Sequence, residues 1–363
     1  MNGALVLGGG PAGAAAAIGL ARGGADHLLI ERTREAADAL CGGFLSWRTL
    51  ETLAGLGVDA DDLNPADVTH LRLFGRGRRV DAPLPRPAKA VSRRRLDALL
   101  LARAEGVGAR VERGVAAREI NGLAARLADG ASLAPSALFL ASGKHDVRGE
   151  ARPAEARGSD PTLGLRIRLG PSPALARLVG DAIELHLVDR GYAGLVLQED
   201  GTANLCMAVH RSRLTEAGGP EALLDRLGRE APALGERLAH ARGPADAVAN
   251  VPYGWRARDG RAGLFRLGDQ AAVIPSLAGE GMGIALASGV RAAYAYLRGG
   301  PGAAVAFQRR LAQDAARPLA LAGGVRDAAE RPALAAAMLG VARLAPGLIQ
   351  VIARLTRIPQ RSG

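Results

Sequence analysis

The 363-residue chain has few aromatic residues, few cysteines and almost no lysine. Five Phe, four Tyr and two Trp are too few and too scattered for the base-stacking platforms of single-stranded nucleic-acid binders. The two cysteines, Cys41 and Cys206, lack CxxC or Cys/His ligand spacing, so we expect neither a disulfide framework nor a metal site. This cysteine usage fits a reducing, cytoplasmic location.

Long uninterrupted apolar runs are also missing. The most apolar segment, LAAAMLGVARLAPGLIQVIARL, is broken by Arg343, Pro346 and Arg354, so it falls short of the ~20 apolar residues of a membrane-spanning helix. The segment 331–358 either covers the rest of the protein, which we expect, or lies on an anionic bilayer. The first apolar stretch has no basic region before it, so a signal peptide is not expected.

The chain has an excess of basic residues, with 47 Lys and Arg against 36 Asp and Glu. Lys89 and Lys144 are the only lysines, and all other basic residues are arginine. Because Ala, Gly and Pro are abundant too, the excess indicates codon bias toward arginine rather than a phosphate-binding face, and no nucleic-acid partner is expected. The 48% of apolar residues suffices for two domains or one large one.

The amino-terminal 31 residues contain a dinucleotide-binding pattern. An apolar run at 4–8 leads into GGGPAG, a helical segment follows, and the next apolar run, HLLIE, ends in Glu31. In GxGxxG, Gly8 permits a tight turn, Gly10 lets the backbone approach a pyrophosphate, and Gly13 lets the helix pack on the strand. The helix N-terminus supplies free N–H groups to phosphate, and Glu31 suits a ribose. FAD and NAD share this loop, so it does not choose between them.

A second motif lies near residue 270. LFRLGD (264–269) is followed by QAAVIPSLAGEGMGIALASGVRAA. Together with GGGPAG, it resembles the second FAD signature of the para-hydroxybenzoate hydroxylase superfamily, and the P-x-x-x-GEGM spacing resembles the geranylgeranyl reductase branch. The resemblance covers residues 1–300. It implies that Asp269 binds the ribityl chain and that the turn from Pro275 to Gly283 passes beside the isoalloxazine and starts a helix.

Three further segments carry the same resemblance. Glu31 is followed by Arg32, CGGFLSW (41–47) resembles the reductase segment that passes close to the flavin, and VSRRRLDALLLARAEG resembles the helix whose leading arginine approaches the pyrophosphate. The FAD-binding residues that the resemblance implies are Gly8, Gly10, Pro11, Ala12, Gly13, Glu31, Arg32, Cys41, Gly42, Arg93, Val115, Gly268, Asp269, Gly281, Met282 and Gly283.

Four strand-length segments between the motifs predict a mainly antiparallel sheet, the floor of a substrate domain: 163–170, 182–188, 191–198 and 203–209. Helical patterns return at 220–240 and beyond 301. We therefore predict an α/β fold with a Rossmann-like FAD-binding domain (1–75, 88–160 and 250–300), an inserted mainly antiparallel β-sheet substrate domain (76–87 and 161–249) and a helical C-terminal segment (301–363).

The chain departs from the family in three places. Ser142-Gly143 stands where hydroxylases have Asp-Gly, which puts the usual NADPH docking in doubt. The Trp-x-Trp-x-Ile-Pro signature of the halogenases is absent, so halogenation is not expected. The reductase branch has Tyr-x-Trp-x-Phe-Pro in its substrate sheet, where this chain has Tyr192-Ala-Gly-Leu-Val-Leu.

Lys144 is one of two lysines in a chain whose other basic residues are arginine, and it precedes His145 and Asp146. It either answers a steric or charge requirement near the cofactor or belongs to a surface turn capped by Asp146. No catalytic residue can be assigned. Candidates near the flavin are Cys41, Lys144, Tyr192, Tyr253 and Trp255. The three aromatic residues among them, with Phe44 and Trp47, suggest an apolar, ring-accepting cavity. His186 and His210 are expected to be structural.

We therefore expect a FAD-dependent oxidoreductase with NAD(P)H as its electron donor and an apolar small molecule as its substrate. The resemblance favours a monooxygenase that hydroxylates an aromatic or polyketide-like substrate through a flavin C4a-hydroperoxide. The alternative is an ene-reductase of a lipid or isoprenoid double bond, and a flavin-binding protein without turnover is a third hypothesis. The oligomeric state is not predicted.

Overall fold

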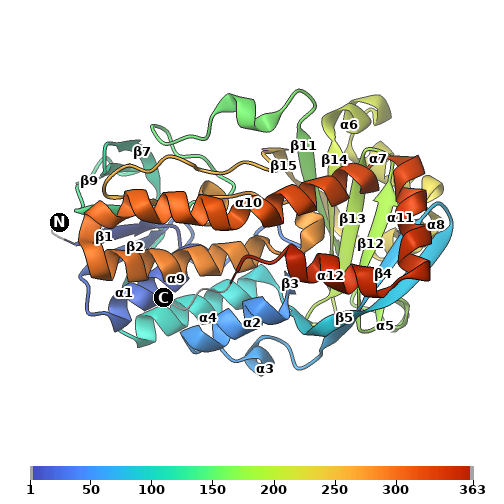
Figure 1. Ribbon diagram of the computed structural model, residues 1–363, viewed down its shortest axis with the longest axis horizontal. Helices are drawn as coiled ribbons and strands as arrows, with labels where there is room; N and C mark the ends of the chain where they lie inside the picture. The colour runs from blue at the N-terminus through green and yellow to red at the C-terminus, as the bar shows by residue number, and fades with distance from the viewer. Residues whose placement is uncertain (1–2, 360–363) are drawn as a thin grey trace.

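Two sheet-based halves lie side by side, and long C-terminal helices run along one side of both (Figure 1). The computed structural model describes residues 3–359, without the side chains of residues 157 and 249. Residues 1–2 and 360–363, at the two ends of the predicted domains, lie outside this part. The predicted fold class, a Rossmann-like domain with an inserted sheet and a helical C-terminus, is confirmed.

The first half is built on a five-stranded sheet whose adjacent strands are all parallel. Its central strands are apolar throughout and buried on both faces, as parallel strands with two covered faces must be. The strands in spatial order are β16 (Leu264–Arg266), β10 (Ala137–Leu140), β1 (Ala4–Leu7), β2 (His27–Glu31) and β6 (Arg110–Arg113).

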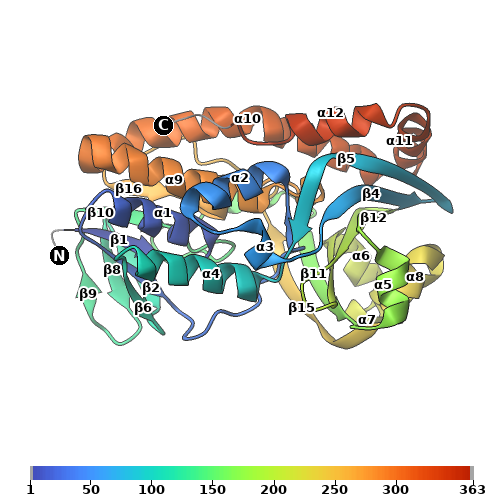
Figure 2. The ribbon, with the colours of Figure 1, turned by 90° about the horizontal axis from the view of Figure 1, so that it is seen from below.

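Helices cover one face of this sheet and a small antiparallel sheet covers the other (Figure 2). The helices are α1 (Pro11–Arg22), α2 (Trp47–Leu56), α4 (Arg93–Gly106) and α9 (Gly281–Gly299), with the one-turn α3 (Ala60–Leu63) after α2. The small sheet consists of β7 (Ala117–Asn121), β8 (Ala124–Leu127) and β9 (Ser132–Leu133).

Helices α1 and α9 approach each other very closely because small residues face each other between them. A Cβ on Gly289 would lie 2.2 Å from the Ala12 carbonyl oxygen, and one on Gly19 would lie 2.7 Å from Ala293 Cβ. Both distances are shorter than real contacts, so the approach requires glycine. It brings the start of α1 and the start of α9, the two predicted cofactor-facing helix ends, into one layer.

The second half is an eight-stranded sheet that is antiparallel except for the β4–β12 pair. Its strand β4 precedes residue 76, so the sheet includes residues on both sides of the predicted boundary there. The strands in spatial order are β15 (Ala241–Val251), β11 (Thr162–Leu169), β14 (Ala203–His210), β13 (Gly191–Leu197), β12 (Ala182–Val188), β4 (Val68–Gly75), β5 (Arg78–Ala90) and β3 (Phe44–Leu45).

Short helices cover the outer face of the eight-stranded sheet, and a charged cluster is buried beneath them. Glu184 accepts hydrogen bonds from Arg72 and Arg237 and contacts His186. Burial by itself raises the pKa of Glu184, but these three partners hold it at about 2. His186 is therefore part of the packing of this face. The helices are α5 (Pro173–Val179), α6 (Arg211–Ala217), α7 (Pro220–Glu230) and α8 (Pro232–Leu238).

Three helices follow α9. Helix α10 (Ala304–Ala329) runs along both halves, and α11 (Pro332–Leu344) and α12 (Gly347–Leu355) fold back over β4 and β5 (Figures 1 and 2). Within residues 3–359 no single helix has the length and hydropathy to cross a membrane, although α11 and α12 taken together do, with a bend of 114° between them. The chain then returns to the centre of the molecule.

Candidate flavin site

The glycine loop between β1 and α1 has the geometry that its sequence predicts. Gly8 has a φ of +110°, and a Cβ there would lie 2.5 Å from the Ala141 carbonyl oxygen. A Cβ on Gly13 would lie 1.9 Å from the Gly8 carbonyl oxygen, so Gly13 is required for packing the helix on the loop. The backbone N–H of Gly9 donates to Glu31 Oε2 at 2.7 Å, which ties the loop to the end of β2.

The start of α1 is open to a ligand. Gly10 occupies the N-cap position without a side-chain cap, and Pro11 begins the helix, so the first-turn N–H groups of Ala12 and Gly13 lack intrahelical partners. A Cβ on Gly10 would meet only the guanidinium of Arg93, at 3.3 Å. Arg93 itself is held by Asp97, with Nη2 2.7 Å from Oδ2. A cation and free N–H groups at a helix start are what a pyrophosphate requires.

Three of the residues predicted to bind FAD lie where β2 ends. Glu31 Oε1 accepts hydrogen bonds from the Thr33 N–H and hydroxyl, both at 2.9 Å. The Val115 N–H donates to the Glu31 carbonyl oxygen at 2.9 Å, and Arg32 is exposed beside them. The structure therefore brings Glu31, Arg32 and Val115 together at one strand end.

Lys144 contacts the loop of residues 34–43 and lies near Asp269. Its Nζ donates to the Leu40 carbonyl oxygen at 3.0 Å and lies 3.8 Å from Asp269 Oδ2. The buried Arg152 fixes this arrangement, because it donates to the carbonyl oxygens of Lys144 and Asp269 and to the carboxylate of Asp146. Asp146 therefore pairs with Arg152. The alternative that the sequence left open was that Asp146 caps a surface turn.

Positive charge collects at this point. Burial and the charges of Arg32, Lys144 and Arg152 lower the pKa of His145, so these three cations lie around one imidazole. Gln270 donates to the carbonyl oxygens of Gly143 and His145, which joins the segment after β10 to the predicted Gly268-Asp269 pair. The Ser142-Gly143 departure therefore sits in a well-held turn beside Asp269.

The turn before α9 is shaped by two glycines. Gly279 has a φ of +60°, and a Cβ there would lie 2.8 Å from the ring of Phe44. A Cβ on Gly283 would lie 2.7 Å from Glu280 Oε1. At Gly281, by contrast, an added Cβ would meet nothing within 4 Å, and no side chain caps the helix start. The start of α9 is therefore open, with its dipole available to a negatively charged edge of a ligand.

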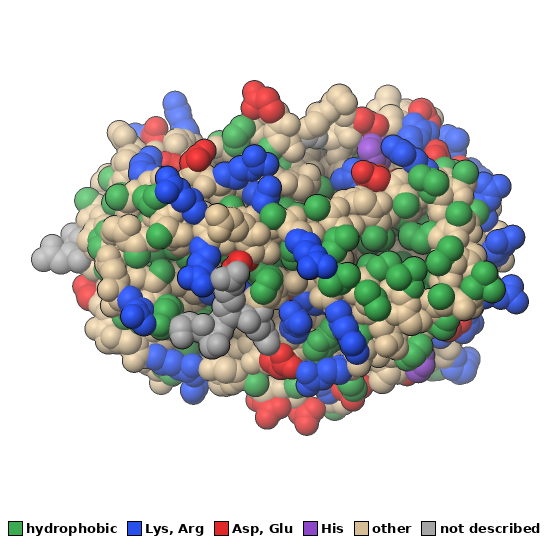
Figure 3. All heavy atoms as spheres, viewed as in Figure 1, with side chains coloured by type: hydrophobic (Ala, Val, Ile, Leu, Met, Phe, Trp, Pro, Cys, Tyr) green, Lys and Arg blue, Asp and Glu red, His purple; other side chains and the backbone are tan. Residues whose placement is uncertain are grey.

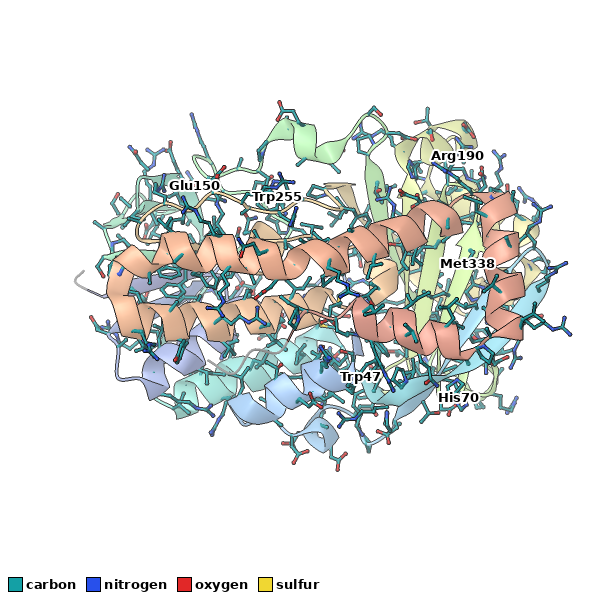
Figure 4. All side chains as sticks on the ribbon, in the orientation of Figure 1. Trp47, His70, Glu150, Arg190, Trp255 and Met338 are labelled. Atoms are coloured by element: carbon teal, nitrogen blue, oxygen red, sulfur yellow. The ribbon has the colours of Figure 1, made fainter. Side chains whose placement is uncertain are left out.

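Glu280, at the N-cap of α9, is buried and bound by the C-terminal end of the described chain. It is 1% exposed and accepts hydrogen bonds from Arg357 Nη1 at 2.8 Å and from the Ile358 N–H at 3.1 Å. Arg357 also donates to the carbonyl oxygens of Ala278 and Gly279 and lies over the ring of Trp47, near the end of α12 (Figure 4). Burial raises the pKa of Glu280, and Arg357 opposes this rise.

The Cys41-Gly42-Gly43 segment lies between the two halves. Asn204 on β14 donates to the Cys41 carbonyl oxygen at 3.5 Å, and Arg166 on β11 donates to the Ala39 carbonyl oxygen at 3.0 Å. An added Cβ at Gly42 would meet nothing within 4 Å. Burial raises the pKa of the nearby Cys206 thiol to about 12, so that thiol stays protonated.

Two tyrosines share one serine hydroxyl at the turn before α9. Tyr192 Oη lies 2.8 Å from Ser276 Oγ, and Tyr253 Oη donates to the same oxygen at 2.9 Å. The Leu277 N–H donates to Tyr192 Oη at 3.3 Å. Burial, with Tyr253 adding to it, raises the pKa of Tyr192 well above its usual range. The eight-stranded sheet is thereby bonded to the predicted flavin-side turn through hydroxyl groups.

Other candidates lie apart from this cluster. Trp255 packs against the guanidinium of Arg152, 5.9 Å from its ring centre, above α10 in Figure 4. His210 lies between Asp160 and Glu330. Sequence reasoning did not single out Ser276, Glu280, Arg152 or Arg357 as site residues. The motif PSLAGEGM contains the first two, but no local signal marks the two arginines.

The glycines separate into two groups that fit a bound dinucleotide. Those at which a Cβ would collide with the protein are structural: Gly8, Gly13, Gly279 and Gly283. Gly10, Gly42 and Gly281 instead have open space or one mobile side chain beside them, so packing does not explain why they are glycine. Close approach of a ligand to the backbone at these three points would explain why they are glycine. The described residues therefore fit FAD, which would supply hydride and oxygen chemistry at its ring.

Residues 2–149 match the family model described as FAD binding domain. Over the whole chain the fold matches a flavin-dependent brominase (TM-score 0.75, 15% identity, covering 98% of this chain and 93% of that one). It also matches a geranylgeranyl bacteriochlorophyll reductase-like protein from Thermoplasma acidophilum (TM-score 0.70, 20% identity, covering 97% and 98%). The chain therefore carries a FAD-binding domain over residues 2–149, and its fold is that of these flavin-dependent proteins.

Two further comparisons name proteins with different activities. Its fold matches a probable FAD-dependent monooxygenase from Pseudomonas aeruginosa (TM-score 0.70, 18% identity, covering 93% of this chain and 99% of that one). A 112-residue stretch is 36% identical to menaquinone reductase of Mycobacterium tuberculosis and covers 30% of this chain. That stretch spans only 28% of the curated relative. The expected FAD-binding domain is confirmed.

An open glycine, Gly10, and an enclosed one, Gly289 at the contact of α1 and α9, should respond differently to the same substitution. Gly10→Ala should leave the free energy of unfolding of the FAD-free protein nearly unchanged and weaken FAD binding at least about tenfold, because the methyl group blocks the approach of the pyrophosphate. Gly289→Ala should lower the free energy of unfolding by about 1–3 kcal/mol, because it overpacks α1 against α9. Denaturant titration and FAD fluorescence quenching measure the two effects. Equal FAD affinity in Gly10→Ala and wild type contradicts the assignment.

Lys144 can be compared with the other lysine in the chain. Lys144→Met removes the hydrogen bond to Leu40 and a cation near Asp269, so FAD affinity should fall about tenfold or more. Lys89→Met is the matched control, because Lys89 pairs with Asp61 and Asp67. It should change stability and leave FAD affinity unaltered. If Lys144→Met binds FAD like wild type, Lys144 belongs to a merely structural turn.

Arg357→Gln leaves the buried Glu280 carboxylate without its cation, so the free energy of unfolding should fall by about 3–5 kcal/mol. The uncompensated charge beside the start of α9 should also lower the reduction potential of bound FAD, by about 30 mV for each 1.4 kcal/mol of destabilised reduced flavin. Denaturant titration and dye-coupled potentiometry measure these effects. Adding Glu280→Gln should restore part of both, and a double variant no better than Arg357→Gln would contradict the pairing.

Proposed function

We propose that this flavoprotein is a FAD-dependent monooxygenase that hydroxylates an apolar, ring-containing substrate between the turn before α9 and the eight-stranded sheet. Such a reaction inserts one oxygen atom of O₂ into a C–H bond and releases the other as water, with a hydride from a reduced nicotinamide and a proton from solvent. The glycine loop, Asp269 and the start of α9 hold the cofactor. The sheet face that carries Tyr192 receives the substrate.

The observation that carries this proposal is the neutrality of the groups on that face. The pKa of Tyr192 is raised well above its usual range and that of Cys206 to about 12, both by burial. Neither group is a strong acid at neutral pH. Reduction of an unactivated double bond requires an acid that delivers a proton to carbon beside the incoming hydride. Hydroxylation also consumes a proton, but on oxygen, where water can deliver it, so no strong acid of the protein is required beside the substrate carbon. Weakly acidic neighbours therefore favour the oxygen-dependent reaction.

Tyr192 has a positioning role in this proposal. Its hydroxyl is fixed by Ser276 and the Leu277 N–H, so the ring presents a constant apolar surface beside the flavin-side turn. Phe44 borders the same turn through Gly279. A rigid aromatic wall excludes water and orients a planar substrate.

An ene-reductase is the second candidate, and a specific observation favours it. The Cys41-Gly42-Gly43 segment lies against the substrate sheet through Asn204, and its resemblance is to the reductase branch. The curated relatives are named menaquinone reductases, so a prenylated quinone is the first substrate to test. We propose NAD(P)H as the electron donor in both cases.

The two reactions differ in the origin of the atoms in the product. With NADH or NADPH, ¹⁸O₂ and a panel of polycyclic aromatic compounds, the monooxygenase should add 18 mass units to a substrate. With menaquinone under strictly anaerobic conditions, a reductase should add two hydrogen atoms. Mass spectrometry of the products reads both outcomes. Anaerobic reduction of the quinone without any ¹⁸O product contradicts the proposal.

Tyr192→Phe tests the positioning role of the Tyr192 hydroxyl. It keeps the ring and removes the hydroxyl that binds Ser276, so kcat should fall with FAD affinity unchanged. A preparation that neither absorbs in the flavin region nor gains thermal stability from added FAD would exclude both reactions, because a ligand at a hundred times its Kd stabilises by about 2.7 kcal/mol.

A further inference from the structure

The exposed large hydrophobic side chains of residues 3–359 all lie on the last four helices. Two helices, α11 and α12, contribute six of them, and Figure 3 shows hydrophobic side chains gathered over this part of the surface. We call these six side chains the outer stripe: Leu334, Val341, Leu344, Leu348, Val351 and Leu355. Exposed apolar groups gathered in this way mark a surface that contacts another molecule.

Both helices are apolar on two opposite faces. The inner face of α11 packs Ala335, Leu339 and Ala342 against the eight-stranded sheet, and Met338 extends toward the same strands in Figure 4. Ile349 does the same for α12. The outer stripe follows spacings of seven and three residues on α11, and of three and four on α12, which is one face of each helix. Covering the sheet therefore explains only half of the apolar residues.

Arginines accompany the outer stripe and acids do not. Arg331, Arg343 and Arg354 are exposed on these helices, and no acidic partner lies in contact with them within the part of the chain that the structure describes. Residues 331–359 contain four arginines and no Asp or Glu. An apolar stripe with arginines beside it matches the acyl boundary and the phosphate layer of an anionic bilayer.

The shape suits a surface contact rather than a crossing. The bend of 114° between α11 and α12 places Leu344, which is 88% exposed, at the corner, with Leu348 just beyond it. A bent pair can lie flat with this corner inserted deepest. A second copy of the chain is a poorer occupant, because a two-fold contact would bring the unpaired arginines of both copies together.

We propose that the outer stripe of α11 and α12 docks this protein on anionic lipid bilayers as a peripheral surface. The leucines at the corner enter the acyl boundary, and Arg343 and Arg354 bind lipid phosphates. Shortly after α12, Arg357 and Ile358 bind Glu280 at the turn before α9, so the docked helices are connected directly to that turn. The docking does not depend on the proposed function. The further inference that an apolar substrate reaches the protein from the bilayer rests on that function.

Vesicle sedimentation of the full-length, FAD-loaded protein tests the docking. Wild type should bind vesicles of phosphatidylcholine and phosphatidylglycerol and should release at high salt. Leu344→Gln/Leu348→Gln should weaken binding by about tenfold or more. Arg343→Gln and Arg354→Gln should each weaken it about fivefold, because each arginine binds the anionic surface.

Leu297→Gln on α9 is the matched control, because Leu297 is also an exposed leucine but lies outside the outer stripe. It should bind vesicles like wild type, and the flavin absorption of every variant verifies its fold. A wild-type protein that stays in the supernatant overturns the proposal, as does equal binding by the Leu344/Leu348 variant. Light scattering that shows a wild-type dimer, dissociated in the Leu344/Leu348 variant, together with no vesicle binding, would assign the stripe to a second copy.

Discussion

The buried pair of Glu280 and Arg357 is the constraint that joins the parts of this protein. A carboxylate that is 1% exposed beside a helix start is unfavourable unless a cation and hydrogen bonds compensate it. Arg357 meets this requirement and at the same time holds two carbonyl oxygens of the turn before α9. The helix start therefore keeps its positive dipole for a ligand, although an acidic residue occupies its N-cap position. The turn that we predict to face the flavin depends on residues from the far end of the chain.

Small residues determine how closely α1 and α9 pack. Glycines at the contact of α1 and α9 bring two helix starts together, and the helices can approach so closely only because no Cβ intervenes. The open glycines at 10, 42 and 281 then lie on three separate segments. Each of these segments belongs to a different stretch of sequence, and at none of the three would an added Cβ meet protein backbone within 4 Å. Openness on all three segments supports a ligand site more than any one glycine motif does, because a chain rich in glycine contains many such motifs by chance.

The sequence was sufficient for the local structure and for the positions of the cofactor motifs. Strand β1, the loop, α1 and β2 follow from apolar runs and glycine spacing, and the strands of the substrate sheet follow from alternation. The sequence did not reveal that β4 joins that sheet, because strand pairing depends on contacts distant in sequence. The partnership of Glu280 with Arg357 was equally hidden, since the two residues are far apart and neither position has a distinctive neighbour. Hydrophobic patterning showed that 331–358 buries apolar surface, but it could not show that a second apolar stripe stays exposed.

The chemistry of the site follows from its polarity more than from any single catalytic group. Positive charge collects on the predicted pyrophosphate and ribityl side, around Arg93, Lys144 and Arg152, where a dinucleotide carries its own negative charge. The substrate side has hydroxyl and thiol groups whose raised pKa values keep them neutral. A cofactor bound between such regions would be anchored electrostatically at one end and would face neutral hydroxyl and thiol groups at the other. In the proposed reaction, an apolar substrate packs against these neutral groups, and the reactive step is left to the flavin ring.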